Sequence, residues 1–259
     1  MQSSTQFSDE DNNETLSCSK PVEDIVFHKT HKCSSSSIQN ILLRYAKDHN
    51  LTLVLPARGH HLSHGDLFEI GEVNNTLWYK AGLQPNIFCL HNRWNGKAVS
   101  KLYGDKKPFY FTILRDPISL LISSWDYYGM NRKFGRNLEK FIFSATKDKR
   151  NLKMFDVYLK NGLLFDFGVE PSDFGNEALI QDLIAEIDQT FDLILLVENF
   201  SESMVLLKHQ LCWDYQDLAN LRLNAHDAST KSVISDKAKK TLRVWLADSY
   251  KFYDYFKVK

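Results

Sequence analysis

Ionisable and hydroxyl side chains are concentrated in the stretch HKTHKCSSSS, which runs from residue 28 to residue 37. An apolar run that starts at Ile25 precedes this stretch, and apolar residues at a helical spacing follow it, at Ile38, Ile41, Leu42 and Tyr45. We therefore predict a strand, a polar loop and a helix whose first N–H groups point into the loop, an arrangement that binds anions. The serines add hydroxyl donors, Lys32 adds positive charge, and Ser36 or Ser37 is expected to cap the helix.

This loop differs from the phosphate-binding loop of ordinary nucleotide hydrolases. The motif GxxxxGK[ST] is absent and the stretch contains no glycine, which argues against an NTPase. Considered alone, the segment has an alternative interpretation, namely a solvated loop in which a serine caps the helix and no ligand binds.

A second polar segment follows the predicted strand in FYFTILRDPISLLISSW. Arg115 lies at the carboxyl end of that strand, Asp116 is expected to cap a helix that begins at Pro117, and Ser123 lies two turns into the helix. A guanidinium and a hydroxyl together suit a phosphate, although Arg115 has the alternative of pairing with Asp116 or another carboxylate. Two anion sites at the carboxyl ends of two strands predict a ligand with two separated phosphate groups.

Short apolar runs alternate with helical periodicity from Asp24 onward, which is typical of an α/β fold with a parallel sheet. We expect residues 1 to 21 to form a disordered lead-in and residues 22 to 259 to form a single domain. Residues 56 to 85 lack a clear period and are expected to form an irregular insertion that contacts substrate. Strands are predicted at Ile25 to His28, Leu51 to Leu55, Asn86 to His91, Phe109 to Leu114 and Leu193 to Val197. Helices are predicted around Ile38 to Tyr45, Ile118 to Trp125, Ile180 to Ile187, Glu202 to Trp213 and Ser235 to Phe256.

Composition excludes several classes of partner. The formal net charge is zero, so we expect no nucleic-acid partner and no attraction to an anionic membrane surface. The chain contains no apolar run long enough for a transmembrane helix, and its polar N-terminus does not resemble a signal peptide, so the chain as given is expected to be soluble. Composition leaves the oligomeric state open. The three histidines of GHHLSH lack a fourth ligand at a recognisable spacing, so we predict a solvent-facing or acceptor-contacting loop and no metal site.

Several longer stretches together resemble one family. They are FHKTHKCSSSSIQNILLRYA, NIFCLHNRWN, FYFTILRDPISLLISSW, FDFGVE, LILLVENFSESMVLLKHQLCWDYQDL, LRLNA and LRVWLADSYKFYDYF. In this order, between about Val22 and Phe256, they resemble the galactose-3-O-sulfotransferases, which include galactosylceramide sulfotransferases and use 3′-phosphoadenosine 5′-phosphosulfate as sulfate donor. The resemblance implies a P-loop-like sulfotransferase fold, with a central parallel sheet flanked by helices, and a reaction that needs no metal.

The same resemblance assigns the two anion sites. Arg115 with Ser123 would bind the 3′-phosphate of the donor, and the first polar loop would bind its 5′-phosphosulfate. Sulfuryl transfer requires in-line positioning and neutralisation of charge on the leaving oxygen, a role that we assign to Lys32 with Lys29 assisting. The residues expected to hold the 5′ part of the donor are Lys29, Thr30, Lys32, Cys33, Ser34, Ser35 and Ser36.

The acceptor hydroxyl loses a proton as it attacks, so the reaction needs a base. His91 ends the apolar run NIFCLH at the carboxyl edge of the predicted sheet, where ligands bind, and it falls on a histidine of the resembling family. We predict that His91 is this base. His31, inside the loop, is the second candidate and would contact the sulfonate or act as a secondary base. For both histidines the alternative is a structural role.

Four further residues are weaker candidates. Cys33 is expected to be a small packing residue, although a reactive thiol beside two lysines is the alternative. Trp94 is a candidate for stacking on a sugar ring. Glu198 and Asn199 follow a predicted strand, and they either contact sugar hydroxyls or cap the next helix.

The resemblance implies a carbohydrate sulfotransferase that acts on the 3-hydroxyl of a terminal β-galactose in a glycolipid or glycoprotein glycan, and this is the function that we predict. One alternative keeps the donor but changes the acceptor to a uronic acid of a glycosaminoglycan, sulfated at the 2-hydroxyl. Another is a catalytically silent glycan- or nucleotide-binding protein. The resemblance also implies a Golgi membrane protein, so membrane association is expected only through an anchor that this chain does not contain.

Overall fold

The computed structural model describes residues 20 to 63, 65 to 145, 154 to 219 and 232 to 259. Three features predicted from the sequence lie outside these ranges. They are the lead-in up to residue 19, His64 of the histidine-rich stretch, and the LRLNA stretch.

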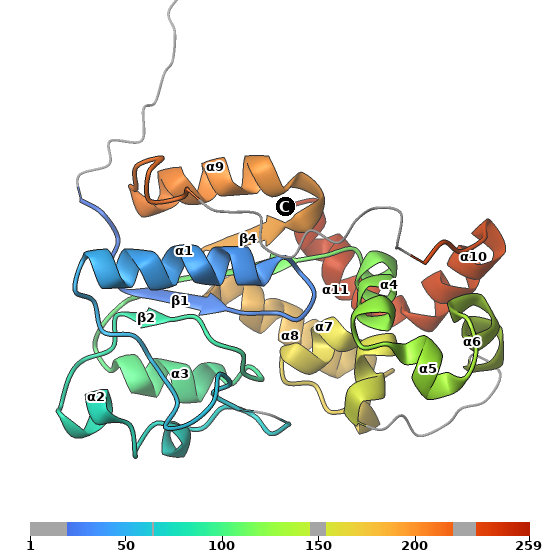
Figure 1. Ribbon diagram of the computed structural model, residues 1–259, viewed down its shortest axis with the longest axis horizontal. Helices are drawn as coiled ribbons and strands as arrows, with labels where there is room; N and C mark the ends of the chain where they lie inside the picture. Colours follow the sequence, from blue (N-terminus) through green and yellow to red (C-terminus); the bar gives the residue numbers. More distant parts are fainter. Residues whose placement is uncertain (1–19, 64, 146–153, 220–231) are drawn as a thin grey trace, which may run out of the picture.

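A four-stranded parallel sheet lies at the centre of the described fold, which confirms the predicted α/β class (Figure 1). The strand order is β2-β1-β3-β4, so β1 and β3 are the two central strands. Every residue of β1 is buried, because helices cover both faces of the sheet, and its sequence IVFH therefore shows no alternation of polar and apolar residues. The strands are β1 (Ile25–His28), β2 (Ile87–Phe88), β3 (Phe109–Leu114) and β4 (Leu193–Leu196).

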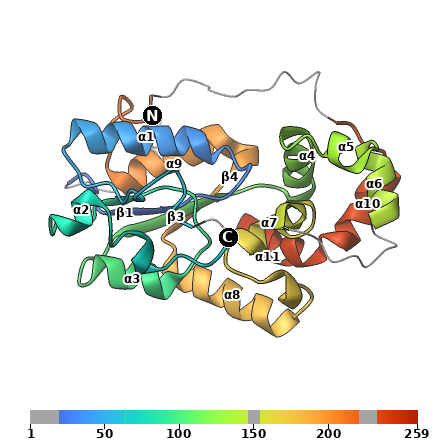
Figure 2. The ribbon, with the colours of Figure 1, turned by 60° about the horizontal axis from the view of Figure 1, so that its bottom comes forward.

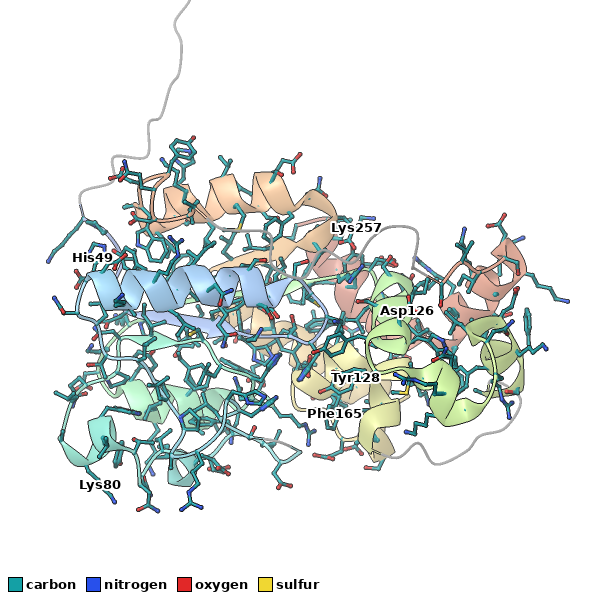
Figure 3. All side chains as sticks on the ribbon, viewed as in Figure 1. His49, Lys80, Asp126, Tyr128, Phe165 and Lys257 are labelled. Carbon is teal, nitrogen blue, oxygen red and sulfur yellow. The ribbon has the colours of Figure 1, made fainter. Side chains whose placement is uncertain are left out.

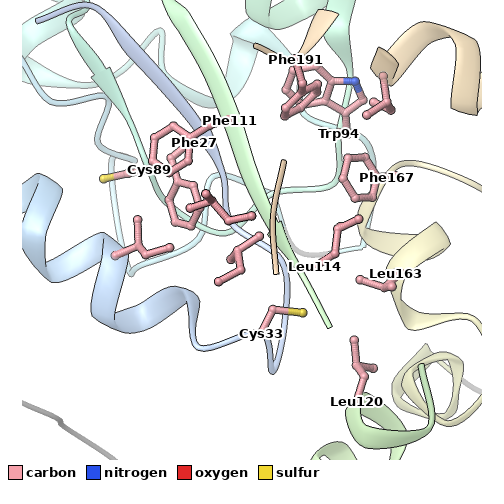
Figure 4. Packing of buried hydrophobic residues seen from close by; sticks show 14 of the residues in the cluster. Phe27, Cys33, Cys89, Trp94, Phe111, Leu114, Leu120, Leu163, Phe167 and Phe191 are labelled. Atoms are coloured by element: carbon pink, nitrogen blue, oxygen red, sulfur yellow. The ribbon is translucent and has the colours of Figure 1, made fainter. Parts of the chain in front are cut away.

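Four helices pack on the two faces of the sheet. They are α1 (Ser35–Asp48), α3 (Gly96–Tyr103), α8 (Glu177–Thr190) and α9 (Phe200–Leu211). Figures 1 and 2 show α1 and α9 on one face and α3 and α8 on the other. The apolar stripe predicted for the first helix is buried against the sheet, with Ile38 and Ile41 fully excluded from solvent. In the core, Phe27 of β1 stacks on Phe111 of β3 with ring centroids 4.8 Å apart (Figure 4).

A second group of helices lies beyond the carboxyl ends of the strands, on the right of Figure 1. The group comprises α4 (Pro117–Tyr127), α5 (Met130–Phe134), α6 (Leu138–Ala145), α7 (Gly162–Asp166), α10 (Asp236–Trp245) and α11 (Ala247–Lys257). The start of α4 is as predicted, because Asp116 caps it by accepting a hydrogen bond from the backbone of Ser119 at 2.9 Å and Pro117 occupies its first position.

The insertion between residues 56 and 85 is irregular, as predicted. Among its described residues, the helical elements are the short helix α2 (Leu77–Lys80) and a 3₁₀ turn, Ile70–Glu72, and isolated bridges join His61 to His91 and Leu67 to Arg93. The remaining 3₁₀ turns are Met154–Leu159, Pro171–Asp173 and Val197–Asn199. Within the described residues, no helix has the length and apolar character needed to cross a bilayer.

Two strand predictions and one helix prediction were wrong in extent. The strand expected at Leu51 to Leu55 is reduced to a single bridge between Leu53 and Ile87, because its partner β2 contains only two residues. The strand expected from Asn86 to His91 contains only Ile87 and Phe88, which are β2. The C-terminal helix is divided in two, because buried Leu246 leaves helical geometry at ψ 22° and redirects α11 toward α7 and α8.

Candidate active site

The loop between β1 and α1 has an unusual backbone. Lys32 and Ser34 adopt left-handed conformations, with φ of 57° and 54°, although neither is glycine. The prediction that Ser36 or Ser37 caps the helix was wrong, because Ser34 is the N-cap and its side chain makes no capping hydrogen bond. The first turn of α1 therefore presents N–H groups that no capping side chain occupies, which suits an anion.

Lys29 lies behind this helix start. Its side chain is 2% exposed, and its ammonium donates to the hydroxyls of Ser35 at 3.2 Å and Ser36 at 3.1 Å. Burial lowers the pKa of Lys29 to about 8. The loop is tied to the sheet, since Ser35 donates to the carbonyl of Thr30 at 2.6 Å and Thr30 donates to the carbonyl of Ile113 at 2.7 Å. The ammonium is thus fixed at the N-terminus of α1.

The backbone of Lys32 is hydrogen-bonded to the side chain of Arg115, the residue that follows β3. Arg115 donates to the carbonyl oxygen of Lys32 at 2.9 Å, and the ammonium of Lys32 lies 3.5 Å from the ring centroid of Tyr127 on α4. Burial, and then the charge of Arg115, lowers the pKa of Lys32 to about 8. Ser123 lies one turn before Tyr127, on the same face of α4. The predicted members of the two anion sites therefore lie at the ends of the adjacent strands β1 and β3.

Asp116 is not the partner of Arg115. One of its carboxylate oxygens caps α4, and the other accepts a hydrogen bond from the hydroxyl of Tyr250 at 2.9 Å. Glu198 is similarly engaged, because it accepts from the backbone N–H of Asp116 and from the hydroxyl of Tyr253, both at 2.9 Å. Both carboxylates therefore anchor α11 to the strand ends, and the interpretation of Glu198 as a sugar ligand loses its support. Asn199 is the N-cap of α9 but makes no side-chain capping bond.

The two candidate bases lie in contact with each other. The rings of His31 and His91 are stacked, with centroids 4.0 Å apart and planes 16° from parallel. Nδ1 of His91 lies 3.2 Å from the carbonyl oxygen of Lys29. Burial, followed by the charges of His31 and Lys29, holds the pKa of His91 far below its ordinary value, so this ring is neutral. The structure therefore brings together both histidines that the sequence singled out.

A buried carboxylate that sequence reasoning missed contacts His31. Asp166 is 1% exposed; its Oδ2 accepts the backbone N–H of His31 at 2.7 Å, and its Oδ1 lies 2.8 Å from Nδ1 of the ring. The hydroxyl of Tyr158 donates to the same Oδ1 at 3.2 Å. The ring of Tyr158 packs against those of Tyr128 and Phe165, which are labelled in Figure 3; the ring centroids are 6.0 Å and 5.9 Å from that of Tyr158. The only signal for Asp166 was its place in the stretch FDFGVE.

Arg93 was also missed, and it holds Asp166 in place. Arg93 is 4% exposed, and its guanidinium donates to the carbonyls of Phe165 at 3.0 Å and Val169 at 3.2 Å, on either side of Asp166. The backbone N–H of Trp94 donates to the carbonyl of Asp166 itself at 2.8 Å. The segment that follows β2 therefore fixes the backbone on which the carboxylate is mounted.

Two weaker candidates have packing roles. Cys33 is fully buried, its thiol contacts the carbonyl of His31 at 3.3 Å, and burial raises its pKa to about 12, so it is not a reactive thiol (Figure 4). Stacking of Trp94 on a sugar was a wrong prediction, because this ring is 3% exposed and packs against His28 and Phe191. Among the residues that the structure describes, His, Cys, Asp and Glu side chains form no group of three or more able to hold a metal ion.

Comparison with known proteins identifies similar chains. The sequence profile of a family described as galactose-3-O-sulfotransferase matches residues 3–259. Galactose-3-O-sulfotransferase 2 of Homo sapiens is 37% identical over 245 residues, which cover 91% of this chain and 60% of that protein. Galactosylceramide sulfotransferase of Bos taurus is 34% identical over 245 residues, which cover 92% of this chain and 56% of that protein. The chain thus spans less than two thirds of the length of these relatives.

Proposed function

The chain belongs to the galactose-3-O-sulfotransferase family, and from this premise we propose that it transfers a sulfuryl group from 3′-phosphoadenosine 5′-phosphosulfate to the 3-hydroxyl of a terminal β-galactose. The acceptor is a glycolipid or a glycoprotein glycan, in the lumen of the Golgi. The observation that carries this proposal is the convergence of Lys29, Lys32 and Arg115 on one loop beside two stacked histidines.

The chemistry of the donor set supports a ligand with two phosphate groups. The start of α1, the ammonium of Lys29 and the exposed serines Ser34 and Ser36 offer one group of anion donors. Arg115 and Ser123 offer a second group at the end of the neighbouring strand. Two such groups match an adenosine that carries phosphates at its 3′ and 5′ positions better than they match a single phosphate.

Each group has a task in the proposed reaction. When bound, the donor supplies an activated sulfuryl group and a phosphate leaving group. Lys32 and Lys29 neutralise the negative charge that develops on the leaving oxygen, and the fixed N–H groups of α1 keep that phosphate in line with the acceptor. One of the stacked histidines, His91 or His31, accepts the proton of the attacking hydroxyl.

The donor site is tested by calorimetric titration with 3′,5′-diphosphoadenosine, against adenosine 5′-phosphate, which lacks the 3′ group. We expect micromolar binding that depends on the 3′-phosphate and is lost in Arg115→Ala, but not in Arg132→Ala, which removes an exposed arginine of α5. Equal binding of both nucleotides would remove the two-phosphate site.

The acceptor is tested with radiolabelled sulfate donor and three substrates: galactosylceramide, a β-galactose-terminated glycan and a glycosaminoglycan. Label on either galactoside, mapped to the 3-hydroxyl by NMR, supports the proposal. Label only on the uronic acid of the glycosaminoglycan supports the 2-O-sulfotransferase instead, and donor binding without transfer to any substrate supports a silent binding protein.

A further inference from the structure

Asp166 has no role in the reaction as described so far, yet both of its carboxylate oxygens are hydrogen-bonded. It is a buried carboxylate, which is costly unless hydrogen-bond donors surround it. Here three donors from two segments do so: the backbone N–H of His31, the ring of His31 and the hydroxyl of Tyr158. Neither of its oxygens is left without a donor.

This contact determines where the proton of His31 lies. A carboxylate only accepts hydrogen bonds, and the hydroxyl of Tyr158, which also lies 3.0 Å from Nδ1, donates its single proton to the same carboxylate. The proton of the neutral ring is therefore on Nδ1 and the lone pair is on Nε2. We infer that Asp166 is a positioning residue, which fixes this tautomer with the help of Tyr158 so that Nε2 of His31 accepts the proton of the galactose 3-hydroxyl. The inference rests on the proposed function and adds to it the choice of base.

The surroundings of the stacked partner, His91, oppose its protonation. A protonated His31 would face the carboxylate of Asp166 at 2.8 Å, which stabilises its positive charge. Among the described residues, His91 has no carboxylate against its ring; burial, followed by the charges of His31 and Lys29, lowers its pKa, and the hydrogen bond to the carbonyl of Lys29 at 3.2 Å offsets this only in part. His91 therefore supports the ring of His31 by stacking, and His31 carries the proton.

The position of Asp166 is held from three sides. Arg93 binds the backbone before and after it, and Trp94 binds its own carbonyl. At the start of α7, the buried side chain of Asn161 accepts a hydrogen bond from Ser249 of α11 at 2.9 Å. A carboxylate mounted on such a frame keeps its geometry through a reaction, as a group that positions a base must.

The step that follows is balanced in atoms and charge. Nε2 of His31 takes the hydroxyl proton while the galactose oxygen forms its bond to sulfur. The bond between sulfur and the 5′-phosphate oxygen breaks, and its electron pair stays on the phosphate. Asp166 stabilises the imidazolium without taking the proton, which His31 then releases to water.

The decisive variant is Asp166→Asn, with Asp182→Asn on the exposed face of α8 as the matched control. In the wild type, long-range ¹H–¹⁵N spectra are expected to show His31 protonated on Nδ1. The asparagine variant should shift that proton to Nε2, because an amide NH₂ now donates to Nδ1. Turnover should fall about 10² to 10³-fold while binding of 3′,5′-diphosphoadenosine changes less than about threefold.

A double-mutant cycle separates positioning from structure. If Asp166 acts through the ring, adding Asp166→Asn to His31→Ala costs no further activity. Because Asp166 also binds the backbone N–H of His31, a purely structural role would instead lower activity again in the double variant. An additive cycle, or a wild-type ring protonated on Nε2, would overturn the inference.

If Asp166→Asn fails to fold, the same spectra are recorded for Tyr158→Phe, in which part of the His31 population should move its proton from Nδ1 to Nε2. An unchanged tautomer and unchanged turnover in that variant would remove the role of Tyr158. If the folded wild type binds no diphosphoadenosine, the proposed function fails, whereas the tautomer measurement still stands.

Discussion

The charges of Lys29 and Lys32 are expected to set the pH range in which the chain binds 3′,5′-diphosphoadenosine. Both ammonium groups have a pKa of about 8, compared with an ordinary value of 10.5, chiefly because they are buried. A lowered lysine pKa means that the positive charge is lost at a lower pH, so affinity for an anion should fall as the pH rises through 8. The ligand does not obscure this change, because its phosphates are already doubly ionised above pH ~7.

The magnitude follows from the fraction of each lysine that is charged. At a pKa of about 8, that fraction falls from roughly nine tenths at pH 7 to roughly one tenth at pH 9, which weakens binding ~10-fold for each lysine that contacts the ligand. A lysine of ordinary pKa would remain ~97% charged at pH 9 and would change the affinity by only a few per cent. Two contacting lysines therefore predict up to ~100-fold weaker binding at pH 9 than at pH 7.

The assay is calorimetric titration at several pH values between 7 and 9, in two buffers of different ionisation enthalpy. At pH 8 we expect uptake of about half a proton per contacting lysine on binding. Lys29→Met and Lys32→Met should each bind more weakly and remove one ~10-fold step of the pH dependence, whereas Lys101→Met, on an exposed part of α3, should leave it unchanged. An affinity that is constant from pH 7 to 9, with no proton uptake, would refute the assignment of these lysines to the anion site.

Three further predictions concern turnover and stability. Lys32→Ala should abolish sulfuryl transfer but leave nucleotide binding weakened and measurable, so full activity in steady-state assays would contradict its role. His28 is fully buried, and burial lowers its pKa from 6.5 to about 4. As the pH falls through this interval, the unfolded state binds a proton that the folded state does not, so ~3 kcal/mol of the unfolding free energy should be lost. His28→Phe should flatten this dependence of the unfolding free energy on pH. Tyr250→Phe and Tyr253→Phe each remove a hydrogen bond to a carboxylate and should lower the unfolding free energy in urea by ~1–2 kcal/mol, with Tyr255→Phe as a smaller, exposed control.

Local signals in the sequence predicted where several residues of the candidate site lie. Periodic apolar residues identified α1 and α4, and the polar stretches at their starts are where the structure has the cationic loop and Arg115. Such features are predictable because strand, loop and helix are adjacent in the chain, so their geometry follows from a short segment. The proximity of His31 and His91 could have been predicted for the same reason, since the two residues follow β1 and β2, which pair with each other in parallel.

Features that depend on distant contacts were not predictable. Asp166 lies 135 residues from His31, and its segment has no strand or motif that points to the sheet edge. The segment is brought to the loop by distant contacts, among them those of the buried guanidinium of Arg93, 72 residues before Phe165, and of the backbone N–H of Trp94. The failure of Leu51 to Leu55 as a strand has the same origin, because a strand needs a partner of matching length and the apolar run alone does not reveal how short β2 is.

The loop combines features that each oppose folding. Left-handed conformations at Lys32 and Ser34 cost roughly 1–2 kcal/mol per residue, and two ammonium groups are withdrawn from water in a chain whose net charge is zero. These costs are tolerated because hydrogen bonds from outside the loop hold its backbone, above all the bond from Arg115 to the carbonyl of Lys32. The proposed function thus gives Arg115 two tasks, to bind an anion and to hold the backbone of Lys32, the residue proposed to neutralise the leaving group. In the proposed site, the positive charge for a doubly phosphorylated ligand is thus drawn from one short loop and from Arg115 at the end of the neighbouring strand, in a chain whose net charge is zero.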